Sequence, residues 1–373
     1  MIHAPGAPAT AMPRPPDALA VASWRTPAGV ALDLRYAPDE AELLDPQPAA
    51  VWQELVSSLP GLGAGTVSGY PVDDPYGGER GAPVVSAHFG CRVEPDHLTF
   101  GAGVTSLLHA LAGLARVGPV AAPAAVHPDL EVWAAQRGAD VHLLEGSPDR
   151  DRLISFVATV RPAVLHLDRP PFSGEPIGLR DLELVASRAG RLGAVVLVDE
   201  SPAPYLGPGG SAVRLAERLD NLVVVRGFTK AYSWGGLRAG YAVASPDVAA
   251  RVRELVPPMQ IGELALEAAL RVLAAGDVFR RLRARVRAVK PEVVRMLRAA
   301  GLDVLEGHED IPWVIVLDPE GTTSDFLAAR GIAGLAPAPA TVPGSRGAGL
   351  LHLTIPLGDE RLRELARRLD GRA

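Results

Sequence analysis

Lysine and cysteine are scarce in this chain of 373 residues, which contains two lysines and one cysteine. The single cysteine, Cys91, excludes an internal disulfide framework and is typical of a protein from a reducing cytosol. Positive charge is carried almost entirely by arginine, and the net charge of −6 lacks the basic excess that a nucleic-acid-binding domain shows. We therefore expect a cytoplasmic protein with no nucleic-acid partner.

Long apolar runs are also missing, since no stretch approaches the roughly 18 apolar residues that a membrane-spanning helix needs. The N-terminus is rich in Ala and Pro and lacks the charged region and apolar core of a signal peptide. We expect residues 1–30 to form a flexible arm, and we expect no membrane partner.

Short apolar runs alternate with helical stretches from Leu98 onward. The runs predict strands at residues 98–100, 118–123, 139–145, 163–168, 194–200, 221–228 and 239–245, with helices between most of them. Runs such as AVVLV and NLVVV are apolar on both faces, so both faces must be covered. The sequence therefore predicts a three-layer α/β/α domain with a mostly parallel sheet.

The pattern changes near Pro246, where helices are expected at residues 246–256 and, as one long element, at residues 265–301. A small α+β tail follows and ends in an amphipathic helix. We expect a large domain over residues 31–245 and a small C-terminal domain over residues 246–373. Residues 31–60 belong to the first of these or pack on the second.

Three features could carry chemistry, although each is weak alone. Lys230 lies among small and aromatic residues in RGFTKAYSWGGLRAGY (226–241), but a single lysine is most often a solvated surface residue. Asp199 ends an apolar strand, at the edge where open α/β sheets bind ligands, although an aspartate there can equally cap a helix. The segment GAGVTS (101–106) joins a strand to a helix, whose first N–H groups can bind phosphate.

Together these features indicate pyridoxal 5′-phosphate (PLP), because this cofactor uses a lysine amine, a carboxylate and a phosphate site at once. The lysine forms a Schiff base, and the acid keeps the pyridine nitrogen protonated. Arginine and the helix N-terminus bind the phosphate. No metal is needed for this chemistry.

Residues 226–241 resemble the class I/II aminotransferases of fold type I, close to the histidinol-phosphate aminotransferase branch. They match the pattern R-x-[LF]-[ST]-K-x-x-x-x-x-G-L-R-x-G-[YF], and the resemblance extends over about residues 60–373. It implies a PLP-dependent enzyme with a small-molecule amino substrate. It also implies a homodimer whose active sites are shared between subunits.

The resemblance assigns roles by position. Lys230 resembles the catalytic Schiff-base lysine, and Asp199 resembles the partner of the pyridine nitrogen. The residues that resemble phosphate ligands are Arg238, Thr229, Gly103, Val104 and Thr105. Tyr70 resembles the tyrosine that reaches the neighbouring subunit's cofactor, with Tyr76 as a rival.

Several positions depart from the family pattern around the cofactor. His127 stands where an aromatic residue usually stacks on the cofactor ring, and imidazole can also stack. Pro171 and Pro202 stand where an asparagine and a tyrosine donate to the cofactor's phenolic oxygen. Proline has no donor, so the ionised phenolic oxygen should be disfavoured. Tyr205 is a possible substitute donor.

The substrate side departs as well. His352 stands where the family has the arginine that clamps the substrate α-carboxylate, and a histidine cannot form that planar two-bond fork. Either Arg346 or Arg169 holds the carboxylate, or the substrate is not an ordinary α-amino acid. An interior strand histidine satisfied by its neighbours is the plain alternative for His352.

Three functions follow from these observations. The first is an aminotransferase-like enzyme of specialised (secondary) metabolism. The second keeps the cofactor but performs β/γ-elimination, replacement or carbon–carbon bond formation through a carbanion, which would explain the altered contacts. The third, a non-catalytic binding protein, is disfavoured because Lys230, Asp199 and Arg238 are all intact.

Overall fold

A seven-stranded sheet forms the centre of the computed structural model, which describes residues 29–62, 68–146, 148–318, 320–336 and 349–371. The strand order is β2-β8-β7-β6-β5-β3-β4. The strands are β2 (Leu98–Gly101), β3 (Val120–Pro123), β4 (Val141–Leu144), β5 (Val164–Asp168), β6 (Val195–Asp199), β7 (Leu222–Gly227) and β8 (Gly240–Ala244). Strand β8 alone runs opposite to the other six strands of this sheet. All seven predicted strands are confirmed.

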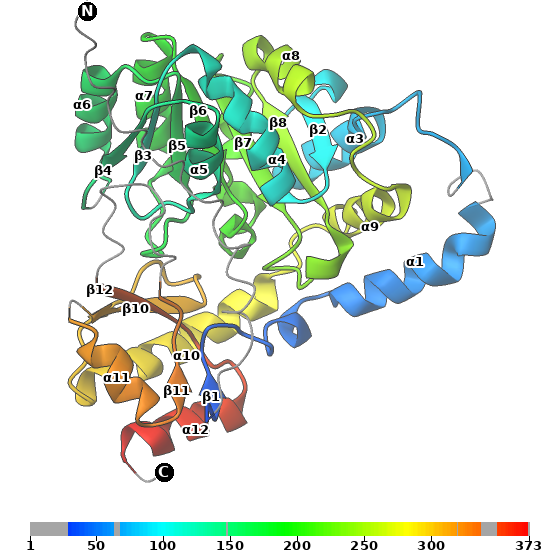
Figure 1. Cartoon of the computed structure of the whole chain (residues 1–373). Helices are drawn as coiled ribbons and strands as arrows, with labels where there is room; N and C mark the ends of the chain where they lie inside the picture. The colour runs from blue at the N-terminus through cyan, green and yellow to red at the C-terminus, as the bar shows by residue number, and fades with distance from the viewer. Residues whose placement is uncertain (1–28, 63–67, 147, 319, 337–348, 372–373) are drawn as a thin grey trace, which may run out of the picture.

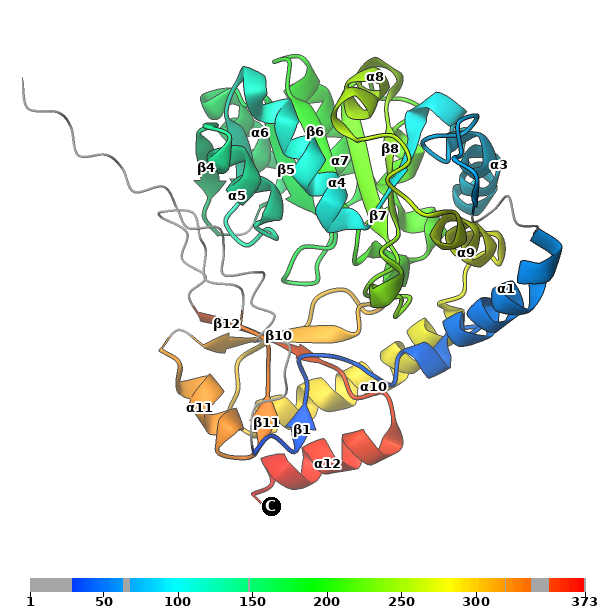
Figure 2. The same cartoon turned by 45° about the vertical axis from the view of Figure 1, so that its right-hand side comes forward.

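Helices cover both faces of this sheet (Figures 1 and 2). Successive strand residues point to opposite sides, so Val196 and Val198 enter one core cluster while Val195 and Leu197 enter the other. The first cluster includes residues of α3 (Gly78–Phe89), α6 (Arg150–Val160) and α7 (Leu179–Gly190). The second includes residues of α4 (Val104–Leu111), α5 (Asp129–Gln136) and α8 (Pro246–Leu255). The predicted three-layer architecture is confirmed.

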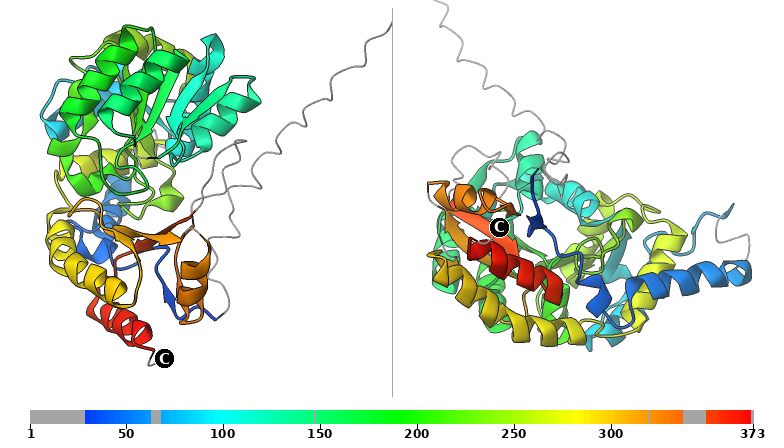
Figure 3. Two further views of the ribbon diagram at one scale, coloured as in Figure 1. Left: turned by 90° about the vertical axis from the view of Figure 1, so that its left-hand side faces the viewer. Right: turned by 90° about the horizontal axis from the view of Figure 1, so that it is seen from below.

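A smaller antiparallel sheet, of order β12-β10-β9, lies below the large one (Figure 3). Its strands are β9 (Val304–Leu305), β10 (Trp313–Asp318) and β12 (Gly349–Thr354). The helices of this part are α10 (Arg280–Ala299), α11 (Thr322–Ala328) and α12 (Asp359–Leu369). No helix in the described ranges is long and apolar enough to cross a membrane.

The N-terminal segment is built into this lower part. Strand β1 (Leu32–Asp33) pairs in parallel with β11 (Ile332–Ala333). The hydroxyl of Thr354 donates to the carbonyl of Leu34 over 2.9 Å. Helix α1 (Pro48–Leu62) then leads away and packs against α9 (Glu263–Ala274), as Figure 1 shows. The backbone groups of Ala31, Leu32 and Leu34 therefore pair with Gly331, Ala333 and Thr354 in the C-terminal part of the chain.

The single long helix predicted over residues 265–301 is wrong, because the chain forms α9 and α10 with a turn between them. Gly276 adopts φ +80°, a left-handed conformation that ends a helix readily. Asp277 then accepts the backbone N–H of Phe279 at the start of α10. The predicted division at residue 246 stays a prediction, and α8 packs against β8 and α4 beside the large sheet.

Candidate functional site

Lys230 lies in the loop that connects β7 to β8. Its carbonyl accepts the N–H of Ser233 over 3.0 Å, and the N–H of Trp234 donates to Phe228 over 3.1 Å, so the loop is a compact turn. Phe228 is fully buried beneath this turn and contacts the rings of Tyr232 and Trp234. The turn is anchored by this aromatic contact, while Lys230 is exposed.

Arg238 closes the same loop against the N-terminal end of α4. Its Nη1 donates to Thr229 Oγ1 over 3.4 Å and to the Gly235 carbonyl over 3.1 Å. A Cβ added at Gly103 would lie 2.8 Å from Arg238 Nη2, so the guanidinium fills the space that a side chain would take. No side chain caps α4 at this end. An arginine, a threonine hydroxyl and free helix N–H groups thus meet at one point, a combination suited to an anion.

Two glycines bring α4 this close to the sheet. Gly227 and Gly240 are register partners on β7 and β8. A Cβ at Gly240 would lie 2.9 Å from the backbone N of Val104, and one at Gly227 would lie 2.7 Å from the Val104 side chain. Both positions therefore require glycine, which explains why the motif around Lys230 is rich in it.

Asp199 lies at the carboxyl end of β6 with 4% of its surface exposed. Its Oδ1 accepts the N–H of Ser201 over 2.7 Å. Asp168, at the end of β5, is its register partner on the neighbouring strand. The predicted cofactor carboxylate thus has a second carboxylate beside it, which the sequence analysis did not anticipate.

Lys230 shares its surroundings with two histidines and an aspartate. Burial, followed by the positive charge of Lys230, lowers the pKa of both His127 and His352 to about 3. The ring of His127 is 41% exposed, but its Nδ1 is buried and has no hydrogen-bond partner among the described residues. Burial raises the pKa of Asp129 to about 6, and Lys230 opposes that rise. Lys230 therefore lies near enough to influence His127, His352 and Asp129, while the cofactor and substrate roles of the two histidines stay predictions.

His352 lies on β12 within an aromatic wall. Its ring centroid is 5.3 Å from that of Trp313 on β10 and 5.6 Å from that of Phe172. The indole N–H of Trp313 donates to the Phe172 carbonyl over 3.2 Å and ties the loop after β5 to the small sheet. The imidazole is neutral near pH 7, because its pKa is lowered, so this wall carries no positive charge.

Arg169 is not brought to this site, which corrects one sequence-based assignment. Its guanidinium donates to Glu200 Oε1 over 2.9 Å, to the Gly210 carbonyl over 2.6 Å and to the Ile177 carbonyl over 3.0 Å. Only 4% of the residue is exposed, and Arg226 binds the same Glu200. Arg169 is therefore part of a buried ion network. Arg346 lies outside the described residues.

The three candidate tyrosines occupy different environments. Tyr70 is 82% exposed, whereas the hydroxyl of Tyr76 donates to the carbonyl of Arg253 over 3.1 Å. Tyr205 is buried and its hydroxyl donates to Glu40 Oε2 over 2.5 Å. Tyr205 is therefore engaged elsewhere and does not replace the donor that Pro202 removes.

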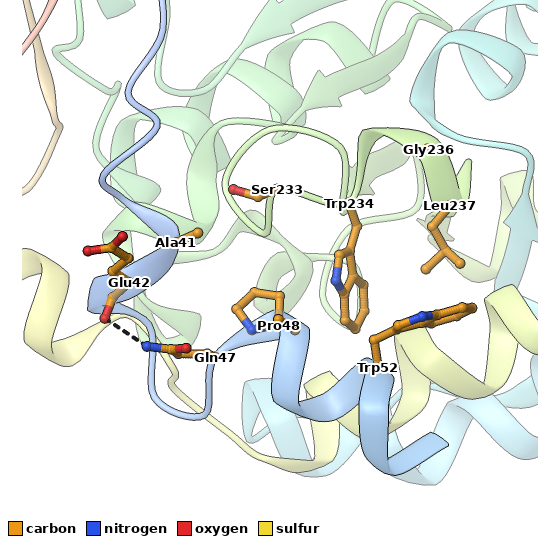
Figure 4. A pocket seen from close by; sticks show the side chains of 10 residues that line it. Ala41, Glu42, Gln47, Pro48, Trp52, Ser233, Trp234, Gly236 and Leu237 are labelled. Atoms are coloured by element: carbon orange, nitrogen blue, oxygen red, sulfur yellow. Dashed lines mark hydrogen bonds between the residues drawn. The ribbon is translucent and has the colours of Figure 1, made fainter. Parts of the chain in front are cut away.

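An apolar cleft of about 570 Å³ lies between the start of α1 and the turn after Lys230 (Figure 4). Its walls include the rings of Trp52 and Trp234, which Figure 4 shows on facing segments. Neither Lys230 nor Asp199 lines this cleft, so we assign it no catalytic part.

The fold and this arrangement define a PLP-dependent enzyme of fold type I. The family model of aminotransferase class I and II matches residues 85–369. The chain therefore belongs to the aminotransferase class I and II family, whose members are PLP-dependent.

Individual relatives agree with this family. An aromatic amino acid aminotransferase of Mycobacterium marinum is 38% identical over 138 residues, which cover 36% of this chain and 37% of that protein, well under two thirds. A histidinol-phosphate aminotransferase of Mycobacterium bovis is 28% identical over 305 residues, covering 78% of this chain and 76% of that protein. The crystal structure of histidinol-phosphate aminotransferase from Sinorhizobium meliloti with PLP superposes with a TM-score of 0.71, at 16% identity, over 96% of this chain and 95% of that one.

The residues present fit this cofactor. Gly103 and Arg238 form a cradle of the right chemistry for a phosphate, with Lys230 and Asp199 at neighbouring strand ends. Buried polar atoms of His127, Asp168 and His352 lack hydrogen-bond partners among the described residues. Such atoms are rare in folded proteins and are commonly satisfied by a ligand or water.

Proposed function

We propose that this chain is a PLP-dependent, aminotransferase-like enzyme that acts on a small amino substrate in specialised metabolism, in the cytoplasm. The observation that carries the proposal is the contact of Arg238 with Gly103 and with Thr229. Thr229 is the residue directly before Lys230 in the sequence. This contact places an anion cradle beside a lysine amine.

Each residue then has a definite task. Arg238, Thr229 and the first amides of α4, at Val104 and Thr105, would hold the phosphate, and Gly103 leaves room for the Arg238 guanidinium. Asp199 would face the ring nitrogen, and His127 would lie against the ring.

When bound, the cofactor supplies an electron sink for a carbanion at the substrate carbon. Lys230 would hold the cofactor covalently and, once displaced by the substrate amine, would move the proton at that carbon. The acidic Asp129 lies near enough to influence this amine. His127 and His352, both neutral near pH 7, leave Lys230 as the basic group of the site.

The wall formed by His352, Trp313 and Phe172 is neutral and aromatic, so it offers the substrate carboxylate no arginine. Arg169 is held by Glu200. Because Arg346 lies outside the described residues, two alternatives stay open: Arg346 holds the substrate carboxylate, or the substrate is not a common α-amino acid. The second alternative would support a specialised pathway over a housekeeping one.

We also propose a homodimer, in which Tyr70 reaches the partner's cofactor phosphate. The hydroxyl of Tyr76 donates to the carbonyl of Arg253 in the same chain, whereas Tyr70 is largely exposed. Large apolar side chains are also exposed on either side of Tyr70 in the sequence, at Trp52, Val56 and Val72. Such a series along one segment is suited to a subunit contact.

A second function, elimination, replacement or carbon–carbon bond formation, is favoured by one observation. Pro171 and Pro202 have no side-chain donor, and the hydroxyl of Tyr205 is bound to Glu40. The usual donors to the phenolic oxygen are therefore absent from these positions, and the cofactor would be tuned differently from that of a transaminase.

The scarcity of lysine permits a sharp test of the proposal. The protein is loaded with PLP, reduced with borohydride, digested and mapped by mass spectrometry. We expect the added mass only on the peptide that contains Lys230, and its loss in Lys230→Ala. The matched control is Lys290→Arg, at the one other lysine, whose buried Nζ donates to the carbonyls of His308 and Ile311.

A label on Lys290, or no label, would contradict the proposal. The reaction type is tested separately by incubating the loaded protein with amino donors. Formation of pyridoxamine 5′-phosphate with an equal amount of oxo acid supports transamination. Its absence, with an elimination or condensation product instead, supports the second function.

A further inference from the structure

Four ionisable side chains, three buried and the fourth, that of Asp168, 13% exposed, meet at the carboxyl edge of the large sheet. Glu131 comes from α5, His166 and Asp168 from β5, and Asp199 from β6. Glu131 and His166 are 1% and 0% exposed. Atoms of His166, Asp168 and Asp199 that could bind a common ligand all lie within 4.8 Å of one another.

These groups form a row that ends at Asp199. Glu131 Oε1 lies 2.7 Å from His166 Nδ1, which is a hydrogen-bond distance. His166 Nε2 then lies 3.9 Å from Asp168 Oδ1. The other oxygen of Asp168 accepts the backbone N–H of His127 over 2.7 Å, so the carboxylate is held on one side.

The inner atoms of this row have no partner. His166 Nε2 and Asp168 Oδ1 are buried and make no hydrogen bond to any of the described residues. Unsatisfied polar atoms are costly in an interior, and here they face each other and the register partner, Asp199. The row is therefore directed at the place where Asp199 would meet the cofactor ring.

The charges of the row depend on one another. Burial alone would lower the pKa of His166, but Glu131 and Asp168 raise it to about 9, so the imidazole is protonated near neutral pH. Burial, and then the charge of Asp199, raise the pKa of Asp168 to about 7, while His166 opposes that rise. The carboxyl group of Asp168 therefore ionises within the physiological range of pH, and His166 favours the ionised form.

We propose that Glu131, His166 and Asp168 are positioning residues that place a second, titratable negative charge beside Asp199. This charge strengthens the hold of the site on the protonated ring nitrogen of the cofactor. The inference rests on the proposed function, because it needs the ring to lie at Asp199. When Asp168 ionises, its proton leaves to solvent and the imidazolium of His166 faces the new carboxylate.

Other charged groups border the row and are common to every variant below. Asp129 faces it from α5, His127 from the preceding turn, and Lys230 from the loop after β7. Their contributions cancel when a variant is compared with wild type at the same pH.

The test measures binding of pyridoxamine 5′-phosphate, which has the ring nitrogen and the phosphate but no aldehyde to react with Lys230. Dissociation constants are determined by calorimetry or fluorescence from pH 5.5 to 8.5 (a range of about three units around the raised Asp168 pKa) for wild type and for Asp168→Asn. We expect a ratio of constants near one at the acidic end that rises to about tenfold at the basic end, since one added charge is worth about one pKa unit or more. Asp220→Asn, at an exposed surface aspartate, should give a ratio near one throughout.

A second variant separates charge from structure. In His166→Gln the Asp168 carboxylate loses the cation that favours its charged form, so its pKa should rise. The rise in affinity for pyridoxamine 5′-phosphate should therefore move to higher pH. If Asp168→Asn does not fold, the shift of this rise in affinity to higher pH in His166→Gln tests the inference by itself. A ratio that is constant across pH, or a step that His166→Gln leaves in place, overturns the inference while the proposed function stands. Failure of wild type to bind the probe overturns both.

Discussion

Replacing Gly103 by alanine tests the phosphate cradle directly. The new Cβ would lie 2.8 Å from Arg238 Nη2 and 3.2 Å from Arg238 Cζ, so the guanidinium must move away. Gly103 also adopts φ 87° and ψ 166°, a region that only glycine enters readily, at a cost of about 1–3 kcal/mol for alanine. The free protein can accommodate the methyl group by moving the flexible end of Arg238. The bound state cannot, because it loses a charge-assisted contact worth about 1.5–3 kcal/mol.

The expected result is a PLP dissociation constant raised about 10- to 100-fold, measured by absorbance titration of the cofactor-free protein. Gly236→Ala is the matched control, since Gly236 lies in the loop that carries Arg238, has no left-handed φ and has open space around its Cβ. Thermal unfolding without cofactor shows whether either variant is folded. A folded Gly103→Ala protein that binds PLP as tightly as the control would refute the assignment of the cradle.

Three further perturbations test other parts of the structure. Glu200→Gln should lower the free energy of unfolding by about 3–5 kcal/mol, because two buried arginines lose their counter-ion; urea unfolding measures this, and a wild-type midpoint would contradict it. Burial raises the pKa of Glu40 from 4.5 to about 8, so the folded state keeps a proton that the unfolded state has lost, and stability should fall as the pH rises between these values. Glu40→Gln should flatten this part of the curve of melting temperature against pH, and an unchanged slope would argue against the protonated carboxyl. His352→Arg should tighten binding of an α-amino acid about tenfold or more relative to the amine that lacks only the carboxylate, and an unchanged preference would show that the missing clamp does not set specificity.

The strands and the lysine loop were predictable because their information is local. A strand that is buried on both faces appears as an uninterrupted apolar run, as β6 does up to Val198 and β7 up to Val225. Lys230, Thr229 and Arg238 stand within ten residues of one another, so one segment of sequence carries the loop. The turn at Gly276 was missed although its signal is also local, since glycine followed by aspartate ends one helix and begins the next.

The ionisable row was not predictable, because its members meet only through the folded sheet. Glu131 and His166 are 35 residues apart, and the pairing of β5 with β6 is what sets Asp168 against Asp199. The available signal was faint: a histidine and an aspartate within the otherwise apolar run AVLHLD. The capture of Arg169 by Glu200, and of Tyr205 by Glu40, likewise depended on contacts between distant segments.

The pairing of β1 with β11 has a consequence for synthesis of the chain. Leu32 leaves the ribosome about 300 residues before its partner Ile332. At about 5–20 residues per second, it waits about 15–60 s with its backbone groups unpaired. The large sheet, whose last strand ends at Ala244, can meanwhile assemble. The pairing of β1 with β11 must then form after the large sheet. A nascent chain stalled after Ala244 would therefore carry all seven strands of the large sheet and an N-terminal segment without its partner strand.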